Sequence, residues 1–146
     1  MSITAVLYFL LVLQTVMAFQ TVAQGSFSTF PNPSVLLINK PSQENIIRSL
    51  VTSPLDLSNE SYIAAFMGEQ NSGGYSIQIV SVVIEDNKVS VDVKYATPPP
   101  DSFNIMAITS PFHIVKIPKV DASATMKVNH IGQPAKPPRT SEFAYM

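Results

Sequence analysis

The stretch that decides the fold runs from Tyr75 to Tyr95 and reads YSIQIVSVVIEDNKVSVDVKY. Apolar and polar residues alternate over Tyr75–Ile79 and again over Val89–Tyr95, which is the period of a β-strand with one buried face. The polar residues Glu85–Lys88 between them suit a turn, so the stretch predicts an antiparallel β-hairpin. The apolar phase switches after Ile79, which indicates either a β-bulge or a strand that passes from one face to another.

Two further strands and a short helix are predicted upstream of the hairpin. Val35–Ile38 is a short apolar run suited to a buried strand, and Tyr62–Met67 lacks polar alternation, as is typical of a central strand buried on both faces. Residues 43–51 carry apolar side chains at helical spacing, and Ser42 is positioned to cap that helix. The loop Gly68–Gly74 ends in two adjacent glycines, which predict a positive φ or a close backbone approach.

The sequence signals for strands and helices are weaker downstream of the hairpin. Pro98–Pro100 interrupts strands and helices, and residues 101–110 are irregular. Phe112–Pro118 predicts another strand, placed at the edge of the sheet. Ala124–Val128 suits one weak strand, whereas residues 132–146 hold few aliphatic side chains and predict a disordered tail.

The first residues have the character of a processing segment. Residues 1–24 contain no charged side chain, and the apolar run ending at Phe19 suits a signal peptide but is short for a bilayer span. Cleavage sites with small residues follow Ala18 and Ala23, and the second is preferred because it leaves a polar mature start. The alternatives are an uncleaved membrane anchor and a helix of the folded domain.

These segments predict an α+β fold, a small and mostly antiparallel β-sheet domain with one short helix. The domain is expected over residues 35–119. It follows a signal peptide over residues 1–23 and a polar lead-in over residues 24–34. A mostly disordered tail is expected over residues 120–146. The signal peptide predicts a secreted, extracellular protein.

Composition excludes several classes of function. The chain has 146 residues, with nine Lys and Arg against ten Asp and Glu, so its net charge of -1 provides no basic face for nucleic acid. The absence of cysteine excludes disulfides, thiolate metal sites and a cysteine nucleophile. Two histidines leave little for a metal site, and we expect neither a metal nor a cofactor.

Catalytic motifs are also absent, so the chain is expected not to be an enzyme. No Gly-x-Ser-x-Gly elbow occurs, and neither His113 nor His130 has a catalytic partner in a local motif. The alternative is a small secreted hydrolase that uses a histidine, or carboxylates that converge in space. The candidate carboxylates are those of Asp56, Glu60 and Glu69.

One modification site is present in the sequence. Asn59-Glu60-Ser61 is an N-glycosylation sequon in a segment with the character of a loop. Asn59 is therefore a candidate glycosylation site, and the protein is expected to be a glycoprotein if its host glycosylates secreted chains.

Four motifs occur in order along the central block. They are the glycine-led loop from Gly68 to Ile77, the valine-rich hairpin, the prolines Pro98–Pro100 and the closing strand from Thr109 to Pro118. This order resembles the PrcB C-terminal domain family, which is named after an accessory subunit of a bacterial surface protease complex. The likeness covers about Val35 to Lys119. Gln70 stands where many members carry a basic residue.

The resemblance implies a non-catalytic, secreted or surface domain that binds another protein, with an extracellular protease complex as the suggested partner. The binding surface would be loops presented from a rigid sheet, or a sheet edge that accepts a strand. The candidate contact residues are Gly73, Gly74, Tyr75, Pro98, Pro111, Phe112 and His113. A membrane-tethered structural component is the alternative if the N-terminal segment stays attached, whereas after cleavage we expect no stable membrane span.

Overall fold

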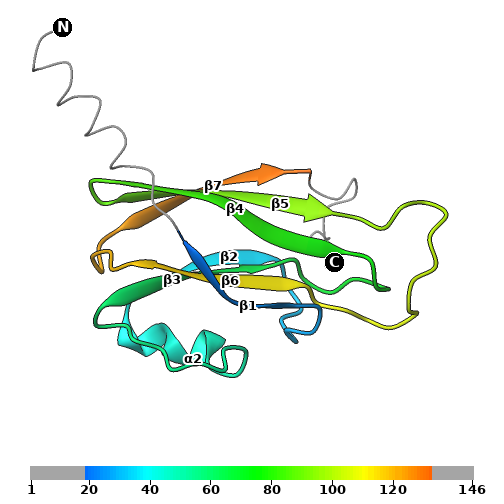
Figure 1. Ribbon diagram of the computed structural model, residues 1–146, viewed down its shortest axis with the longest axis horizontal. Helices are drawn as coiled ribbons and strands as arrows, with labels where there is room; N and C mark the ends of the chain where they lie inside the picture. The colour runs from blue at the N-terminus through cyan, green and yellow to red at the C-terminus, as the bar shows by residue number, and fades with distance from the viewer. Residues whose placement is uncertain (1–18, 133–146) are drawn as a thin grey trace, which may run out of the picture.

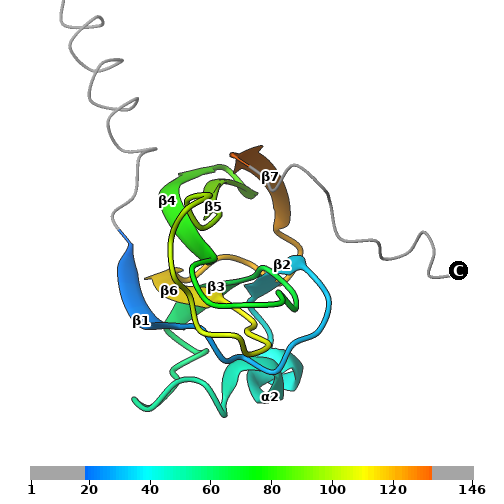
Figure 2. The same ribbon diagram turned by 90° about the vertical axis from the view of Figure 1, so that its right-hand side faces the viewer.

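A computed structural model describes residues 19–132, and in it two β-sheets pack face to face (Figures 1 and 2). The larger sheet has the order β1 (Gln20–Gly25), β6 (Phe112–Pro118), β3 (Glu60–Phe66) and β2 (Ser34–Ile38), and its neighbouring strands are all antiparallel. The smaller sheet has the order β4 (Ser76–Glu85), β5 (Lys88–Ala96) and β7 (Thr125–Ile131). A short 3-10 turn, η1 (Pro41–Gln43), leads into the one-turn helix α2 (Glu44–Ile47).

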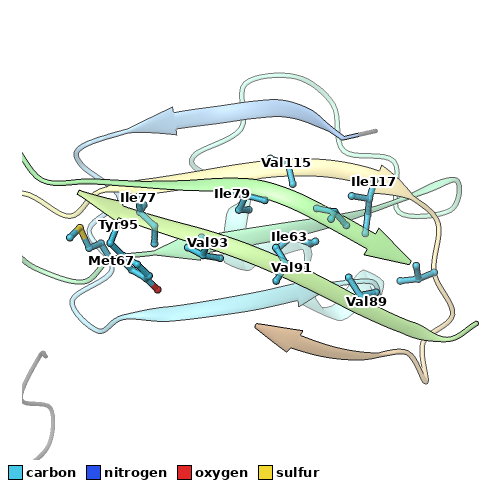
Figure 3. Close-up of a cluster of buried hydrophobic side chains, with 13 residues drawn as sticks. Ile63, Met67, Ile77, Ile79, Val89, Val91, Val93, Tyr95, Val115 and Ile117 are labelled. Carbon is cyan, nitrogen blue, oxygen red and sulfur yellow. The ribbon is translucent and has the colours of Figure 1, made fainter. Parts of the chain in front are cut away.

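The main hydrophobic core lies between the two sheets (Figure 3). It is formed by alternate residues of β3 to β6, because alternate side chains of a strand point to the same face. Its members from β4 and β5 include Ile77, Ile79 and Val91, and those from β3 and β6 include Ile63 and Val115. All five are at most 1% exposed, so the smaller sheet is held chiefly by apolar packing.

A second core lies on the opposite face of the larger sheet, under α2 and the chain that follows it. Tyr62 and Phe66 of β3 and Ile114 of β6 point to this side, where they meet Ile47 of α2. The larger sheet is therefore buried on both faces, which explains the unbroken apolar run of Tyr62–Met67. The prediction of a central strand in this run is confirmed, since β3 lies between β2 and β6.

A β-bulge interrupts the β4–β5 hairpin at Val80. The pairing register shifts between Ile79, which faces Val93, and Ser81, which faces Asp92. The extra residue restores the phase, so that Val82 returns to the inter-sheet core while Val80 is exposed. Of the two explanations that the sequence left open, the bulge is the one found.

The fold class is confirmed in its coarse form, because the strands are mostly antiparallel and the helix is short. The expected single sheet is instead two sheets, and β5 pairs with β7 in parallel. The prediction that Phe112–Pro118 lies at the sheet edge is wrong, because β6 is paired on both sides by β1 and β3.

The ends of the domain also differ from the prediction. Gln20–Gly25 forms β1, so a strand stands where the signal peptide was expected to meet a polar lead-in. The weak strand expected over Ala124–Val128 is found as β7, which extends to Ile131 within the range expected to be a mostly disordered tail. Residues 1–18, most of the expected signal peptide, and residues 133–146 lie outside the described part of the chain.

The helix is shorter than the range 43–51 that the sequence predicted, and Ser42 does not cap it. The side chain of Gln43 instead accepts hydrogen bonds from the backbone N–H groups of Asn39, at 2.9 Å, and Lys40, at 3.0 Å. Within residues 19–132, no helix has the length and apolar character needed to cross a membrane.

Candidate functional site

A long loop between β5 and β6, residues 97–111, lies at the same end of the molecule as the loop Gly68–Gly74. Figure 1 shows both at the right-hand end, and Figure 2 looks onto that end. The prolines Pro98–Pro100 begin the longer loop and prevent β5 from continuing. This end of the molecule is therefore built from two irregular loops that contact each other.

The two adjacent glycines are the point where the loops touch. Gly74 has a φ of +90°, and a Cβ atom added there would lie 2.6 Å from Cβ of Pro98. A Cβ atom on Gly73 would lie 2.9 Å from Cγ1 of Ile105, while its backbone N–H donates to the Ile105 carbonyl at 3.0 Å. Both the positive φ and the close approach predicted from the sequence are therefore present.

A second set of hydrogen bonds fixes the far end of the longer loop. The backbones of Gln70 and Thr109 exchange two hydrogen bonds, at 2.8 and 2.9 Å. The Thr109 hydroxyl donates to the Ser72 carbonyl at 2.8 Å, and the Ser110 carbonyl accepts from the Ser28 N–H at 3.0 Å. The segment between Ile105 and Thr109 is consequently anchored at both ends.

Between and beside these anchors the longer loop exposes apolar side chains. We call residues 103–108 the apolar loop. Its four large hydrophobic side chains are Phe103, Ile105, Met106 and Ile108, with exposures of 103%, 58%, 90% and 65%. Phe27, which forms a β-bridge with Ser110, is also exposed. Such a concentration of apolar side chains on a braced loop is typical of a recognition surface.

The sequence does not predict the apolar loop as a recognition surface, because residues 101–110 show only an irregular pattern. The signal available was three aliphatic residues and one phenylalanine in an irregular stretch after three prolines. In a loop, such side chains have no regular element to turn them toward the core.

Several of the contact residues predicted from the sequence lie elsewhere. Gly74 is exposed, and Tyr75 and Pro98 are half-buried, so these three residues lie at or near the surface beside the apolar loop. Pro111 and Phe112 are buried, and the Phe112 ring belongs to the core under α2. These two residues belong to the interior and do not form a surface.

His113 is also buried, and both of its ring nitrogens are occupied. Nδ1 accepts a hydrogen bond at 2.8 Å from the backbone N–H of Ile79 in the opposite sheet. Nδ1 is therefore unprotonated, and Nε2 carries the proton that it shares with the Thr21 hydroxyl at 2.8 Å. Burial lowers the pKa of His113 below its ordinary value of 6.5, because an imidazolium would be poorly solvated there.

The other candidates for chemistry lie apart from His113 in the hydrogen-bond network. His130 accepts or donates at Nδ1 with the Tyr95 hydroxyl at 2.8 Å, and Glu60 forms an ion pair with Lys116 at 3.3 Å. Among residues 19–132, neither histidine hydrogen-bonds an acidic side chain, and no three His, Asp or Glu residues are grouped as a metal site.

Asn59 is exposed in the turn that precedes β3. Its side-chain amide donates to Asp56 Oδ2 at 2.9 Å. Hydrogen bonds from Asn59 and then from Ser58 lower the pKa of the Asp56 carboxyl. The sequon therefore lies on an accessible turn.

The comparisons with known proteins bear on the two loops together. A family model described as PrcB C-terminal matches residues 61–118, a narrower range than the resemblance suggested. The matched range runs from β3 to β6 and includes both Gly68–Gly74 and the apolar loop. No curated protein and no solved structure gives a significant match. The resemblance to the PrcB C-terminal family is therefore confirmed over residues 61–118.

Proposed function

We propose that this protein is a secreted, non-catalytic binding domain that engages another protein through its apolar loop. The observation that carries the proposal is the exposure of Phe103, Ile105, Met106 and Ile108 on a loop whose backbone is fixed by Gly73 and Thr109. A braced apolar loop loses little conformational entropy when it binds, and large apolar side chains supply most of the energy at protein interfaces.

The occupation of the histidines supports a role without catalysis. A general base needs a free ring nitrogen in reach of substrate, whereas both nitrogens of His113 are bound within the core. His130 is accessible but is bonded to the Tyr95 hydroxyl and not to a carboxylate. Among residues 19–132, the hydrolase alternative therefore has no histidine hydrogen-bonded to an acidic side chain in its favour.

The PrcB C-terminal family suggests an extracellular protease complex as the partner. An accessory domain in such a complex would stabilise the peptidase and would need no active site of its own. Tyr75 and Pro98 would then form the margin of the contact surface around the apolar loop.

The test is affinity capture of the tagged, secreted chain from the extracellular fluid of its source, followed by binding measurements between the purified proteins. The variant Phe103→Ser/Met106→Ser removes the two most exposed side chains of the loop. The matched control Val80→Ser/Ile131→Ser removes exposed apolar side chains from the smaller sheet. We expect the loop variant to weaken Kd at least tenfold and the control to leave it unchanged.

The outcomes separate the parts of the proposal. Capture of a peptidase that is lost with the loop variant supports the whole proposal. Capture of a protein of another class supports protein binding but contradicts the protease partner. An empty capture by a folded chain contradicts protein binding. Loop-dependent flotation with phosphatidylcholine vesicles, without a protein partner, would show that the loop enters a membrane surface instead.

A further inference from the structure

Two positions in the N-terminal segment suit signal-peptide cleavage, and the sequence favours the second only because it leaves a polar mature start. Cleavage after Ala18 has Val16 at the third position back, and cleavage after Ala23 has Thr21 there. The two mature chains differ by residues 19–23. The structure places these residues in and next to β1, so the fold itself distinguishes the two positions.

Cleavage after Ala23 would remove most of β1. In the ladder with β6, Gln20 pairs with Lys116, Thr21 with Val115 and Ala23 with Ile114, with a bulge at the residue between. Only Gln24 and Gly25 would remain opposite β6. Most of β6 would then be an edge strand with unpaired N–H and C=O groups, which is a template for aggregation.

The side chains of residues 19–23 also contribute to the interior. Phe19 packs against the inter-sheet core, while Val22 and Ala23 pack against the core under α2. The Thr21 hydroxyl holds Nε2 of His113. Loss of residues 19–23 would therefore expose both cores at the same edge of the larger sheet. It would also remove the hydrogen-bond partner of the buried His113 side chain.

We infer that the signal peptide is removed between Ala18 and Phe19, so that the mature protein retains the whole of β1. The step adds one water across the Ala18–Phe19 peptide bond and leaves a carboxylate on Ala18 and an ammonium on Phe19. The inference rests on the proposed secretion, and it replaces the position after Ala23 that the sequence favoured.

The experiment produces the full chain with its own N-terminus and a C-terminal tag in a secretion-competent host. The chain in the medium is analysed by N-terminal sequencing and intact mass. Two matched variants are run beside it, Ala18→Val and Ala23→Val, each of which places a branched side chain at one cleavage position. We expect Phe19 as the first residue, a loss of at least tenfold of this species with Ala18→Val, and no change with Ala23→Val.

The results also separate this inference from the proposed secretion. Secreted chain that begins at Gln24, or a Phe19 start that is insensitive to Ala18→Val, would overturn the inference while secretion stands. A chain that remains in the cells with residues 1–18 attached would overturn both the cleavage position and the proposed secretion. A Phe19 start with the expected response of the two variants supports both.

Discussion

The ring of His113 in β6 accepts a hydrogen bond from the backbone N–H of Ile79 in β4, and this bond crosses the space between the two sheets. Ile79 is the last residue before the bulge at Val80, where the β4–β5 ladder is locally interrupted. A backbone donor next to a bulge needs a partner from outside the ladder, and the histidine supplies one in an otherwise apolar core.

This bond predicts a dependence of stability on pH. Because burial lowers the pKa of folded His113 below 6.5, the unfolded chain binds this proton more readily than the folded one. The free energy of unfolding is expected to be at its full value above about pH 6.5 and to fall below it, by at most about 1.4 kcal/mol per pH unit. Urea denaturation between pH 7.5 and pH 5 measures this change.

Two variants at the same position serve as controls for the pH experiment. His113→Gln keeps an acceptor for the Ile79 N–H but does not titrate, so its stability should be nearly constant over this range. His113→Leu leaves the N–H without a partner and should lower the free energy of unfolding by about 1–3 kcal/mol at pH 7.5. A wild-type protein whose stability does not change between pH 7.5 and pH 5 would contradict the assignment.

Two phenylalanines should respond in opposite ways to substitution. Phe103 is fully exposed and Phe112 is 7% exposed. Phe103→Ala is expected to change the free energy of unfolding by less than about 0.5 kcal/mol, whereas Phe112→Ala should lower it by about 3–5 kcal/mol. Chemical denaturation of both variants checks this, and equal losses would show that the apolar loop packs against the domain in solution.

Gly74 should be necessary for the position of the longer loop. Gly74→Ala introduces a side chain at φ +90° and against Pro98, and should cost at least about 1–2 kcal/mol from the backbone conformation alone. Hydrogen exchange of amides 102–106 is expected to accelerate. Gly132→Ala is the matched control, because it has a similar φ of +69° but lies beside Tyr95, so it should leave exchange in the loop unchanged.

The bulge predicts that Val80 can be both replaced and deleted. Val80→Thr should be nearly neutral, because this side chain is 39% exposed. Deletion of Val80 would leave Ile79, Val82 and Ile84 at alternate positions that face the core, and the pairs of Ile79 with Val93 and of Ser81 with Asp92 would become consecutive. The denaturation midpoints of the two variants provide the comparison. A loss of about 3–6 kcal/mol on deletion, the value for two side chains that leave the core at 1.5–3 kcal/mol each, would contradict the register.

The hairpin, its bulge and the central strand β3 were predictable because the period of their side chains is a local property. β1 was not, since Gln20–Gly25 is largely polar and is a strand only because it pairs with β6, far away in sequence. The interior position of β6 and the parallel pairing of β7 were missed for the same reason. Strand periodicity identifies a buried face but not the neighbouring strand.

The candidate site was predicted in part. The close approach of Gly73 and Gly74 to the longer loop followed from residue type, since glycine has no Cβ atom to prevent it. The exposure of the aromatic side chains could not be predicted in this way, because Phe103 and Phe112 are both phenylalanines and lie close together in the sequence. Which of the two is buried depends on the sheet into which β6 is inserted.

The pairing of β1 with β6 has a consequence for the order of folding. β1 leaves the ribosome and any translocation channel first, yet its partner strand follows more than ninety residues later, since Gln20 pairs with Lys116. The β4–β5 hairpin can form early because its strands are adjacent, whereas closure of the larger sheet must wait for β6. The first strand of the domain is therefore among the last to pair. The rate of this pairing limits how quickly the emerging chain becomes resistant to aggregation and proteolysis.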